Sequence, residues 1–221
     1  MKSQLLLCAV LTGFMAGTSA QQPGKITRLD GSKITIAEAD AFARRTLAEH
    51  HVMGAQLAVL NHGKLVWSSA YGVATLDPAR PMDRDTSTWA ASITKSLFAT
   101  FVLTLVERGA FDLDQPVVKQ LTQPLNSYPS YRESASALVD DPAWPLITGR
   151  MLLSHSSGLA NFAHLEADKK MHLHFKPGTR FLYSGEGINL LQFVIEQRLG
   201  KPIDQLMQST LFLPLHMART S

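Results

Sequence analysis

The sequence predicts an α/β (α+β) protein in which an antiparallel sheet with flanking helices is followed by a mostly helical region. A helix pattern and a hairpin pattern occupy the first part of the 221-residue chain, and apolar residues at helical spacing dominate from Ser92 onward. With 45% hydrophobic and 18% charged residues, the composition is that of an ordinary globular protein. The net charge is only +3, without a dense basic cluster, so we expect no nucleic-acid partner.

Residues 1–20 have the pattern of a secretory signal peptide. Lys2 precedes an apolar run over residues 5–16, and four small residues end the segment. The run is shorter than the roughly 20 apolar residues of a membrane-spanning helix. We therefore expect a secreted or periplasmic protein with one domain over residues 21–221 and no stable membrane anchor after cleavage. The single cysteine, Cys8, lies inside the signal, so the mature chain would hold no disulfide and no thiolate metal site.

The first element after the signal is predicted as a helix over residues 35–51. Thr35 and Glu38 form a capping-box pair, and apolar residues recur behind them at helical spacing. A hairpin follows, with strands at 56–60 and 65–71 on either side of turn-forming residues. We expect no later strand to pair with this hairpin.

Helical periodicity returns at Ser92 and continues until Gly109, which ends the helix. Pairs of adjacent apolar residues repeat every four positions along it, which predicts a buried helix. Two further helices are predicted over residues 148–156 and 186–199, each followed by a glycine.

The first chemical motif is Ser92-Ile93-Thr94-Lys95, at the start of the buried helix. A spacing of three on a helix puts the hydroxyl and the ammonium on one face, one turn apart. A serine becomes a good nucleophile when a neighbour removes its proton, and a lysine of lowered pKa can take part in that step. A helix start also offers free N–H groups and a positive dipole to an oxyanion. The structural alternative is that Ser92 caps the helix and Lys95 is a solvated first-turn residue.

Six segments of the chain resemble the serine β-lactamase and penicillin-binding-protein superfamily, in the family's order and at family-like separations. The nearest branch is the class C β-lactamase group, with D-alanyl-D-alanine carboxypeptidases and related esterases. The resemblance implies a β-lactamase/transpeptidase-like fold and a serine hydrolase that acts through a serine acyl-enzyme. The segments cover residues 89–97, 105–109, 113–117, 152–159, 175–185 and 213–217.

The resemblance implies that Ser92 is the acylated nucleophile, Lys95 its proton partner and Tyr183 the phenolate-type base or proton shuttle. Without the family, Tyr183 would be interpreted as a packing residue before a helix. A phenol with an ordinary pKa of about 10 needs a nearby cation to act as a base at neutral pH, and Lys95 could supply it. The resemblance implies no cofactor. The substrate would be a small-molecule or peptidoglycan-like acyl compound: an ester, a β-lactam or a D-amino-acid peptide.

The chain departs from the family's pattern in two places. Gly185 stands at the substrate-binding position where the tyrosine motif usually ends in Asn, so we expect ester hydrolysis to exceed lactam hydrolysis. The third motif, Lys-Thr-Gly or His-x-Gly on a strand, does not occur after Tyr183, so the sequence resembles a member truncated at its C-terminus, with an incomplete sheet. Two alternatives therefore remain open: a non-catalytic or sensor-type protein of the same fold, or an inactive truncated fragment.

The histidines raise a competing hypothesis. His172 and His174 have a spacing that can chelate a metal on a strand, but His-Glu-x-x-His is absent and no carboxylate stands at a metal-ligand spacing from the pair. We therefore expect no metal site. His155 is expected to bond to the backbone or to pack beside a helix end. Residue order leaves a Ser-His-Asp triad open, although the chain has no Gly-x-Ser-x-Gly elbow.

Overall fold

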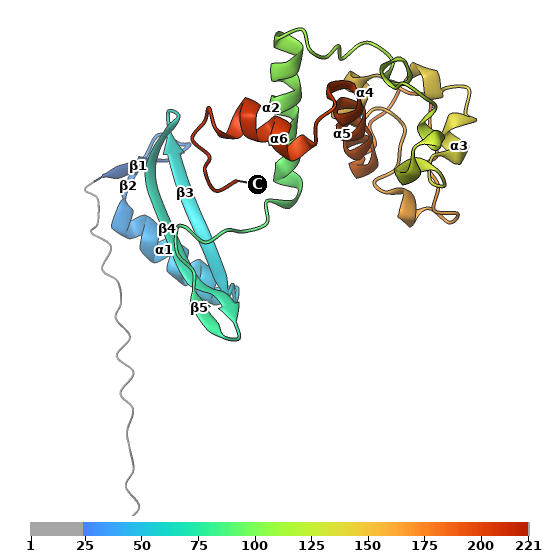
Figure 1. Ribbon diagram of the computed structural model, residues 1–221. Coiled ribbons are helices and arrows are strands. Elements are labelled where there is room, and N and C mark those ends of the chain that lie inside the picture. The colour runs from blue at the N-terminus through green and yellow to red at the C-terminus, as the bar shows by residue number, and fades with distance from the viewer. Residues whose placement is uncertain (1–23, 221) are drawn as a thin grey trace, which may run out of the picture. The chain divides into compact units, whose positions relative to one another are not determined.

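The computed structural model describes residues 24–220, and the signal-like segment at residues 1–20 lies outside them. The chain divides into two compact units, Met1–Thr88 and Trp89–Ser221, which are described separately below (Figure 1). Within residues 24–220, no helix is both long enough and apolar enough to cross a membrane.

The first unit begins with two short strands that the sequence did not predict. β1 (Lys25–Thr27) and β2 (Lys33–Thr35) pair in antiparallel fashion, and β2 leads directly into α1 (Ile36–Glu49). The predicted capping box is confirmed: the Glu38 N–H donates to Thr35 Oγ1 over 3.2 Å, and the Thr35 N–H donates to Glu38 Oε2 over 2.7 Å. These bonds satisfy two backbone donors at the helix start, which explains why α1 begins where the sequence indicates.

The sheet of the first unit has three antiparallel strands in the order β3-β4-β5. The predicted hairpin is confirmed and its strands are longer than expected, with β3 at Gly54–Asn61 and β4 at Lys64–Leu76. The expectation that no later strand joins the hairpin is wrong, because β5 (Ala79–Pro81) returns along β4. The turn between them contains Asp77-Pro78, a turn-forming pair. β5 was not predicted because three residues are too few to show a strand period.

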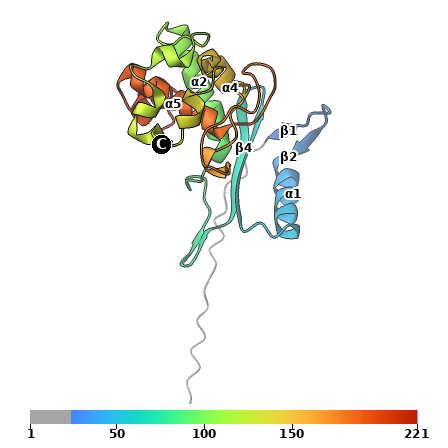
Figure 2. The ribbon, with the colours of Figure 1, turned by 90° about the vertical axis from the view of Figure 1, so that its right-hand side faces the viewer.

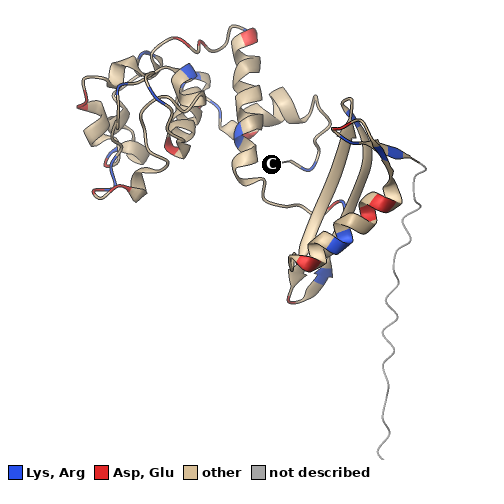
Figure 3. Ribbon diagram, turned by 180° about the vertical axis from the view of Figure 1, so that it is seen from behind, with Lys and Arg blue, Asp and Glu red and all other residues tan. Residues whose placement is uncertain are grey.

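Helix α1 lies alongside the sheet of the same unit (Figure 2). One face of the helix is buried through Ile36, Ala39 and Ala43. The Tyr71 hydroxyl of β4 donates to Asp40 Oδ1 over 2.7 Å and links helix to strand. The rest of the helix carries acidic residues toward both ends and arginines between them (Figure 3), so its outer face is solvated.

The second unit opens with a one-turn 3-10 helix, Ala91–Ile93, which continues into α2 (Thr94–Glu107). The prediction of a buried helix is confirmed, since Phe98, Phe101, Val102 and Leu105 are all buried. Ser92 lies in the 3-10 turn, two residues before the regular α-helix starts. The residue that caps α2 is Ile93, without a side-chain hydrogen bond, so the interpretation of Ser92 as a helix cap is wrong.

The rest of the second unit is built from short helical turns and one long helix. The helix predicted over 148–156 is only five residues long, because the backbone turns to a φ of +56° at His155. The helix predicted over 186–199 is confirmed and starts one residue earlier. The α-helices are α3 (Ser136–Val139), α4 (Gly149–Leu153), α5 (Gly185–Leu199) and α6 (Ile203–Met207); 3-10 turns cover Val117–Gln120, Leu125–Ser127, Pro129–Tyr131, Trp144–Leu146 and Ala163–Leu165, and a π turn covers Gln208–Phe212.

The core of the second unit forms where α5 packs against α4 (Figure 1). Leu190, Leu191, Val194 and Ile195 of α5 are fully buried in one cluster with the apolar face of α2. A fully buried Leu, Val or Ile side chain stabilises a fold by roughly 1.5–3 kcal/mol relative to an exposed one. The long helix α5 is therefore the fixed support on which the residues just before it are placed.

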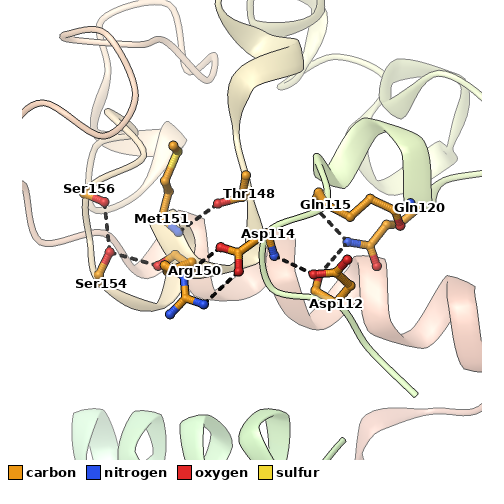
Figure 4. A network of polar contacts seen from close by, with 9 residues as sticks. All are labelled: Asp112, Asp114, Gln115, Gln120, Thr148, Arg150, Met151, Ser154 and Ser156. Atoms are coloured by element: carbon orange, nitrogen blue, oxygen red, sulfur yellow. Dashed lines mark hydrogen bonds and ion pairs between the residues drawn. The ribbon is translucent and has the colours of Figure 1, made fainter. Parts of the chain in front are cut away.

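A polar network joins the segment after α2 to the start of α4 (Figure 4). The Arg150 guanidinium donates two hydrogen bonds to the Asp114 carboxylate, at 2.7 and 2.8 Å. The Gln120 side-chain amide donates to the carbonyls of Asp112 and Gln115, at 3.3 and 3.2 Å. The bidentate pair links the start of α4 to the segment after α2, and the chain that leaves α4 carries part of the candidate site.

Candidate active site

The structure brings together the three residues that the sequence analysis singled out as catalytic. Lys95 Nζ donates to Ser92 Oγ over 3.2 Å, and the Tyr183 hydroxyl donates to the same oxygen over 2.8 Å. Ser92 is exposed, Lys95 is half-buried and Tyr183 is 38% exposed. All three belong to the second unit, and the serine oxygen is the centre of the cluster.

The local backbone presents Ser92 at the N-terminal end of a buried helix. Ala91, just before it, has a φ of +44°, which lies in the left-handed region and costs a non-glycine residue roughly 1–2 kcal/mol. This bend and the 3-10 turn place Ser92 ahead of α2, where the helix dipole favours negative charge. Strain of this kind is found where a fold holds a functional residue in place.

Tyr183 is placed by the residues that follow it at the start of α5. The N-cap of α5 is Ser184, which is fully buried. Its Oγ accepts from the Gly187 N–H and donates to the Ala160 carbonyl, both over 2.8 Å. This cap anchors the chain one residue beyond Tyr183 to both the helix and a distant loop.

The neighbours of Tyr183 make its phenol easier to ionise than a free tyrosine. Hydrogen bonding by the Lys95 ammonium and then by Ser92 lowers the pKa of the Tyr183 phenol below its ordinary value of 10. Lys95 Nζ lies 5.2 Å from the centre of the Tyr183 ring. The cation that the sequence analysis required beside this phenol is therefore present, and the cluster contains a nucleophile, a cation and a base within hydrogen-bond reach.

His155 contacts the backbone, as predicted, and it also contacts the ring of Tyr183, which was not predicted. Its Nδ1 accepts from the Ser184 N–H over 3.2 Å, and its ring centre lies 4.6 Å from that of Tyr183. Burial, followed by the positive charge of Lys95, lowers the pKa of His155 below its ordinary value of 6.5. The imidazole is therefore uncharged at neutral pH.

Gly185 is buried and its N–H donates to Asn161 Oδ1 over 2.9 Å. A Cβ at this position would lie 2.7 Å from the Phe162 ring and 2.9 Å from Asn161 Oδ1, so only glycine fits. The carboxamide of Asn161 lies where a side chain of residue 185 would begin. Its nitrogen makes no hydrogen bond with any residue of the described chain. The role of Gly185 in substrate binding stays a prediction, and no sequence signal pointed to Asn161.

The two histidines of the competing metal hypothesis bind different carboxylates. His172 Nε2 lies 2.9 Å from Asp168 Oδ2, and His174 Nε2 lies 2.7 Å from Glu166 Oε1. Neither carboxylate contact was predicted from the sequence. Among residues 24–220, no three His, Cys, Asp or Glu side chains gather as ligands for a metal ion.

Known proteins share both the sequence pattern and the fold of this chain. A sequence model of the family described as Beta-lactamase matches residues 39–221. Esterase EstB of Burkholderia gladioli is 29% identical over 215 residues, which cover 86% of this chain and 52% of the esterase. The chain therefore spans about half the length of this curated relative.

Two solved structures show the likeness in fold. The octameric penicillin-binding protein homologue from Pyrococcus abyssi matches with a TM-score of 0.65 at 24% identity, over 83% of this chain and 44% of that protein. A class C beta-lactamase matches with a TM-score of 0.63 at 22% identity, over 82% of this chain and 49% of that protein. The predicted β-lactamase/transpeptidase-like fold with antiparallel sheets and helices is confirmed.

Proposed function

Because the chain belongs to the beta-lactamase family, we propose that it is a serine hydrolase that transfers an acyl group through an ester on Ser92 and prefers carboxylic esters as substrates. The observation that carries the proposal is the hydrogen-bonded cluster of Ser92, Lys95 and Tyr183. The similarity to an esterase along most of this chain supports the same class of reaction.

In the acylation step, Tyr183 acts as the base. Its phenolate takes the proton of Ser92 while Ser92 Oγ forms a bond to the carbonyl carbon of the ester. The Lys95 ammonium stabilises the phenolate before this transfer, and the N-terminal end of α2 favours the oxyanion that forms. When the oxyanion collapses, the bond to the leaving alcohol breaks and the alcohol takes the proton from Tyr183.

Deacylation repeats the sequence with water in place of serine. Tyr183, again a phenolate, takes a proton from water as the water oxygen attacks the acyl carbon. The bond to Ser92 Oγ then breaks, Ser92 recovers a proton from Tyr183, and the acid leaves. One tyrosine thus shuttles the proton in both halves of the reaction.

The surroundings of Gly185 support a preference for esters. The Asn161 oxygen already accepts from the Gly185 N–H, so one of its two acceptor positions is used, whereas its nitrogen can donate to a substrate. An ester offers acceptors only, which such a donor satisfies. The acylamino group of a cephalosporin also carries an N–H that needs an acceptor. Gly185 has no side chain to provide one, and leaving the N–H unpaired costs about 1–3 kcal/mol.

The same proposal includes a secreted or periplasmic location, which rests on the signal-like pattern of residues 1–20. Its substrate would be a small acyl compound outside the cytoplasm. No partner protein or cofactor is part of the proposed reaction.

The test is a comparison of kcat/KM for a p-nitrophenyl ester and a cephalosporin, with Ser92→Ala as the control. We expect the ester to be favoured by about tenfold or more, because one unmet hydrogen bond costs about 1–3 kcal/mol and 1.4 kcal/mol is tenfold. A preference for the lactam would contradict the assigned substrate, and turnover that survives Ser92→Ala would contradict the mechanism. A burst of one equivalent of nitrophenol without turnover would instead favour the sensor-type alternative.

A further inference from the structure

His155 holds the chain on both sides of Tyr183. Its carbonyl accepts from the Leu182 N–H over 2.8 Å, and its Nδ1 accepts from the Ser184 N–H over 3.2 Å. Its ring lies against that of Tyr183, with centres 4.6 Å apart and planes at 41°. One residue therefore fixes the backbone before and after the phenol as well as the phenol ring itself.

We propose that His155 is the positioning residue for Tyr183, and that it acts only while its imidazole is uncharged. This inference rests on the proposed function, because it assigns Tyr183 the proton transfer. The structure shows why the charge state matters. A ring nitrogen that accepts from an amide N–H carries no proton, so the uncharged ring has its proton on Nε2. Protonation of Nδ1 would put one N–H against another and break the bond to Ser184.

The groups around the imidazole oppose its protonation. Lys95 is the charged group of the described chain whose field acts on His155, and Tyr183 is the titratable side chain in ring contact with it. Phe181 contacts the ring edge-on, with centres 5.8 Å apart. Burial and the Lys95 charge lower the pKa of His155, so the uncharged form persists below the usual range of histidine.

Asparagine is the substitution that separates the two roles of this histidine. Its Oδ1 branches from the same atom as histidine Nδ1 and can accept from the Ser184 N–H, but it takes no proton in this pH range. Asparagine also tolerates the left-handed backbone, which matters because His155 has a φ of +56°. Alanine keeps only the carbonyl contact with Leu182.

The kinetic experiment compares His155→Ala and His155→Asn in the full protein. We expect His155→Ala to lower kcat by about tenfold to a hundredfold with little change in KM, since small misplacement of a reacting group can cost about a hundredfold. We expect His155→Asn to restore most of that loss. In a Tyr183→Phe background, His155→Ala should cause no further loss, because the residue it positions has lost its hydroxyl.

The pH profile gives a readout that a purely structural role would not change. Log kcat/KM of the wild type should steepen toward a slope of 2 at the acid end, because both Tyr183 and His155 must be unprotonated. In His155→Asn the slope should stay at 1. His172→Asn is the matched control, since His172 is a half-exposed histidine paired with Asp168, and it should keep the wild-type slope.

A titration that needs no turnover keeps this inference separate from the proposed function. The ionisation of Tyr183 is followed by phenolate absorbance, as the difference between the wild type and Tyr183→Phe. His155→Ala should move this ionisation back toward the ordinary pKa of tyrosine, and His155→Asn should leave it lowered. The inference is overturned if His155→Ala leaves the titration unmoved, or if its kinetic loss is equally large in the Tyr183→Phe background. Absence of Ser92-dependent turnover in the wild type would overturn the proposed function alone.

Discussion

At the scale of single residues, the neighbours of Ser92 and Tyr183 change the reactivity of these two side chains. Ser92 Oγ accepts hydrogen bonds from both Lys95 and Tyr183, and the lysine charge makes the phenolate accessible. The lysine thus assists the serine chiefly through the tyrosine. If this is correct, removing the lysine charge should change the pH dependence of the reaction and not only its rate.

The variant Lys95→Met tests this role, because methionine keeps most of the apolar stem and removes the charge. The required form of Tyr183 is the negative phenolate, so loss of the cation raises the Tyr183 pKa toward 10. The acid limb of the Ser92 acylation rate should therefore move to higher pH, with a large loss at pH 7 that is partly recovered near the ordinary tyrosine pKa. Lys119→Met, which changes an exposed lysine of the same unit, serves as the control. An acid limb that stays in place in Lys95→Met would contradict the role.

The site residues differ in how far the sequence could reveal them. Ser92 and Lys95 are three apart on one helix, so their contact follows from local geometry. Tyr183 is 91 positions from Ser92, and only the family resemblance connected the two. Asn161 and the tyrosine contact of His155 could not be predicted, because they depend on how two loops close against the start of α5.

At the scale of elements, the sequence predicted those with strong local signals. The capping box at Thr35, the apolar period of α2 and the glycine after α5 all marked real helices. The strands β1, β2 and β5 were missed because three residues show no period, and most 3-10 turns were missed for the same reason. Helix α4 is shorter than predicted because the backbone at His155 is left-handed. The sequence could not indicate this, because the side chain of histidine does not identify that conformation.

The turn at Gly158 offers a test of how tightly this region is packed. Gly158 has a φ of +92°, and a Cβ there would lie 2.6 Å from the Phe175 carbonyl oxygen. Gly109 has a φ of +69° with nothing within 4 Å, so it is the matched control. We expect Gly109→Ala to lower the free energy of unfolding by about 1–2 kcal/mol from backbone strain alone. Gly158→Ala should cost clearly more, because the carbonyl must also move.

The measurement for both glycine variants is urea denaturation in a background without Trp67 and Trp89, followed by the fluorescence of Trp144, which is buried in the same unit. Equal losses at the two positions would show that the contact with Phe175 is easily relieved.

At the scale of the whole molecule, the two units have cores of very different size. In the second unit one cluster of buried residues draws on α2, α4, α5 and α6. In the described part of the first unit, the buried apolar residues are Ile26, Ile36, Ala39, Ala43 and Tyr71. Hydrophobic burial is the main favourable term in folding, so the second unit should be the more stable one.

This difference predicts two unfolding transitions. Trp67 lies in β4 of the first unit and Trp144 in the core of the second, so variants that keep only one tryptophan report on each unit separately. We expect the Trp67 signal to change at a lower urea concentration than the Trp144 signal. Coincident transitions would show that the chain unfolds as one cooperative body.

The central claim is that Ser92 carries the acyl group, and the most direct test is the mass of the protein after reaction with a fluorophosphonate. The account predicts a single adduct that peptide mapping places on Ser92, absent in Ser92→Ala and lost in Lys95→Ala. Ser96→Ala, which removes an exposed serine four residues after Ser92, in the first turn of α2, should be labelled like the wild type. An adduct that survives Ser92→Ala, or that maps to another residue of the wild type, would contradict the account.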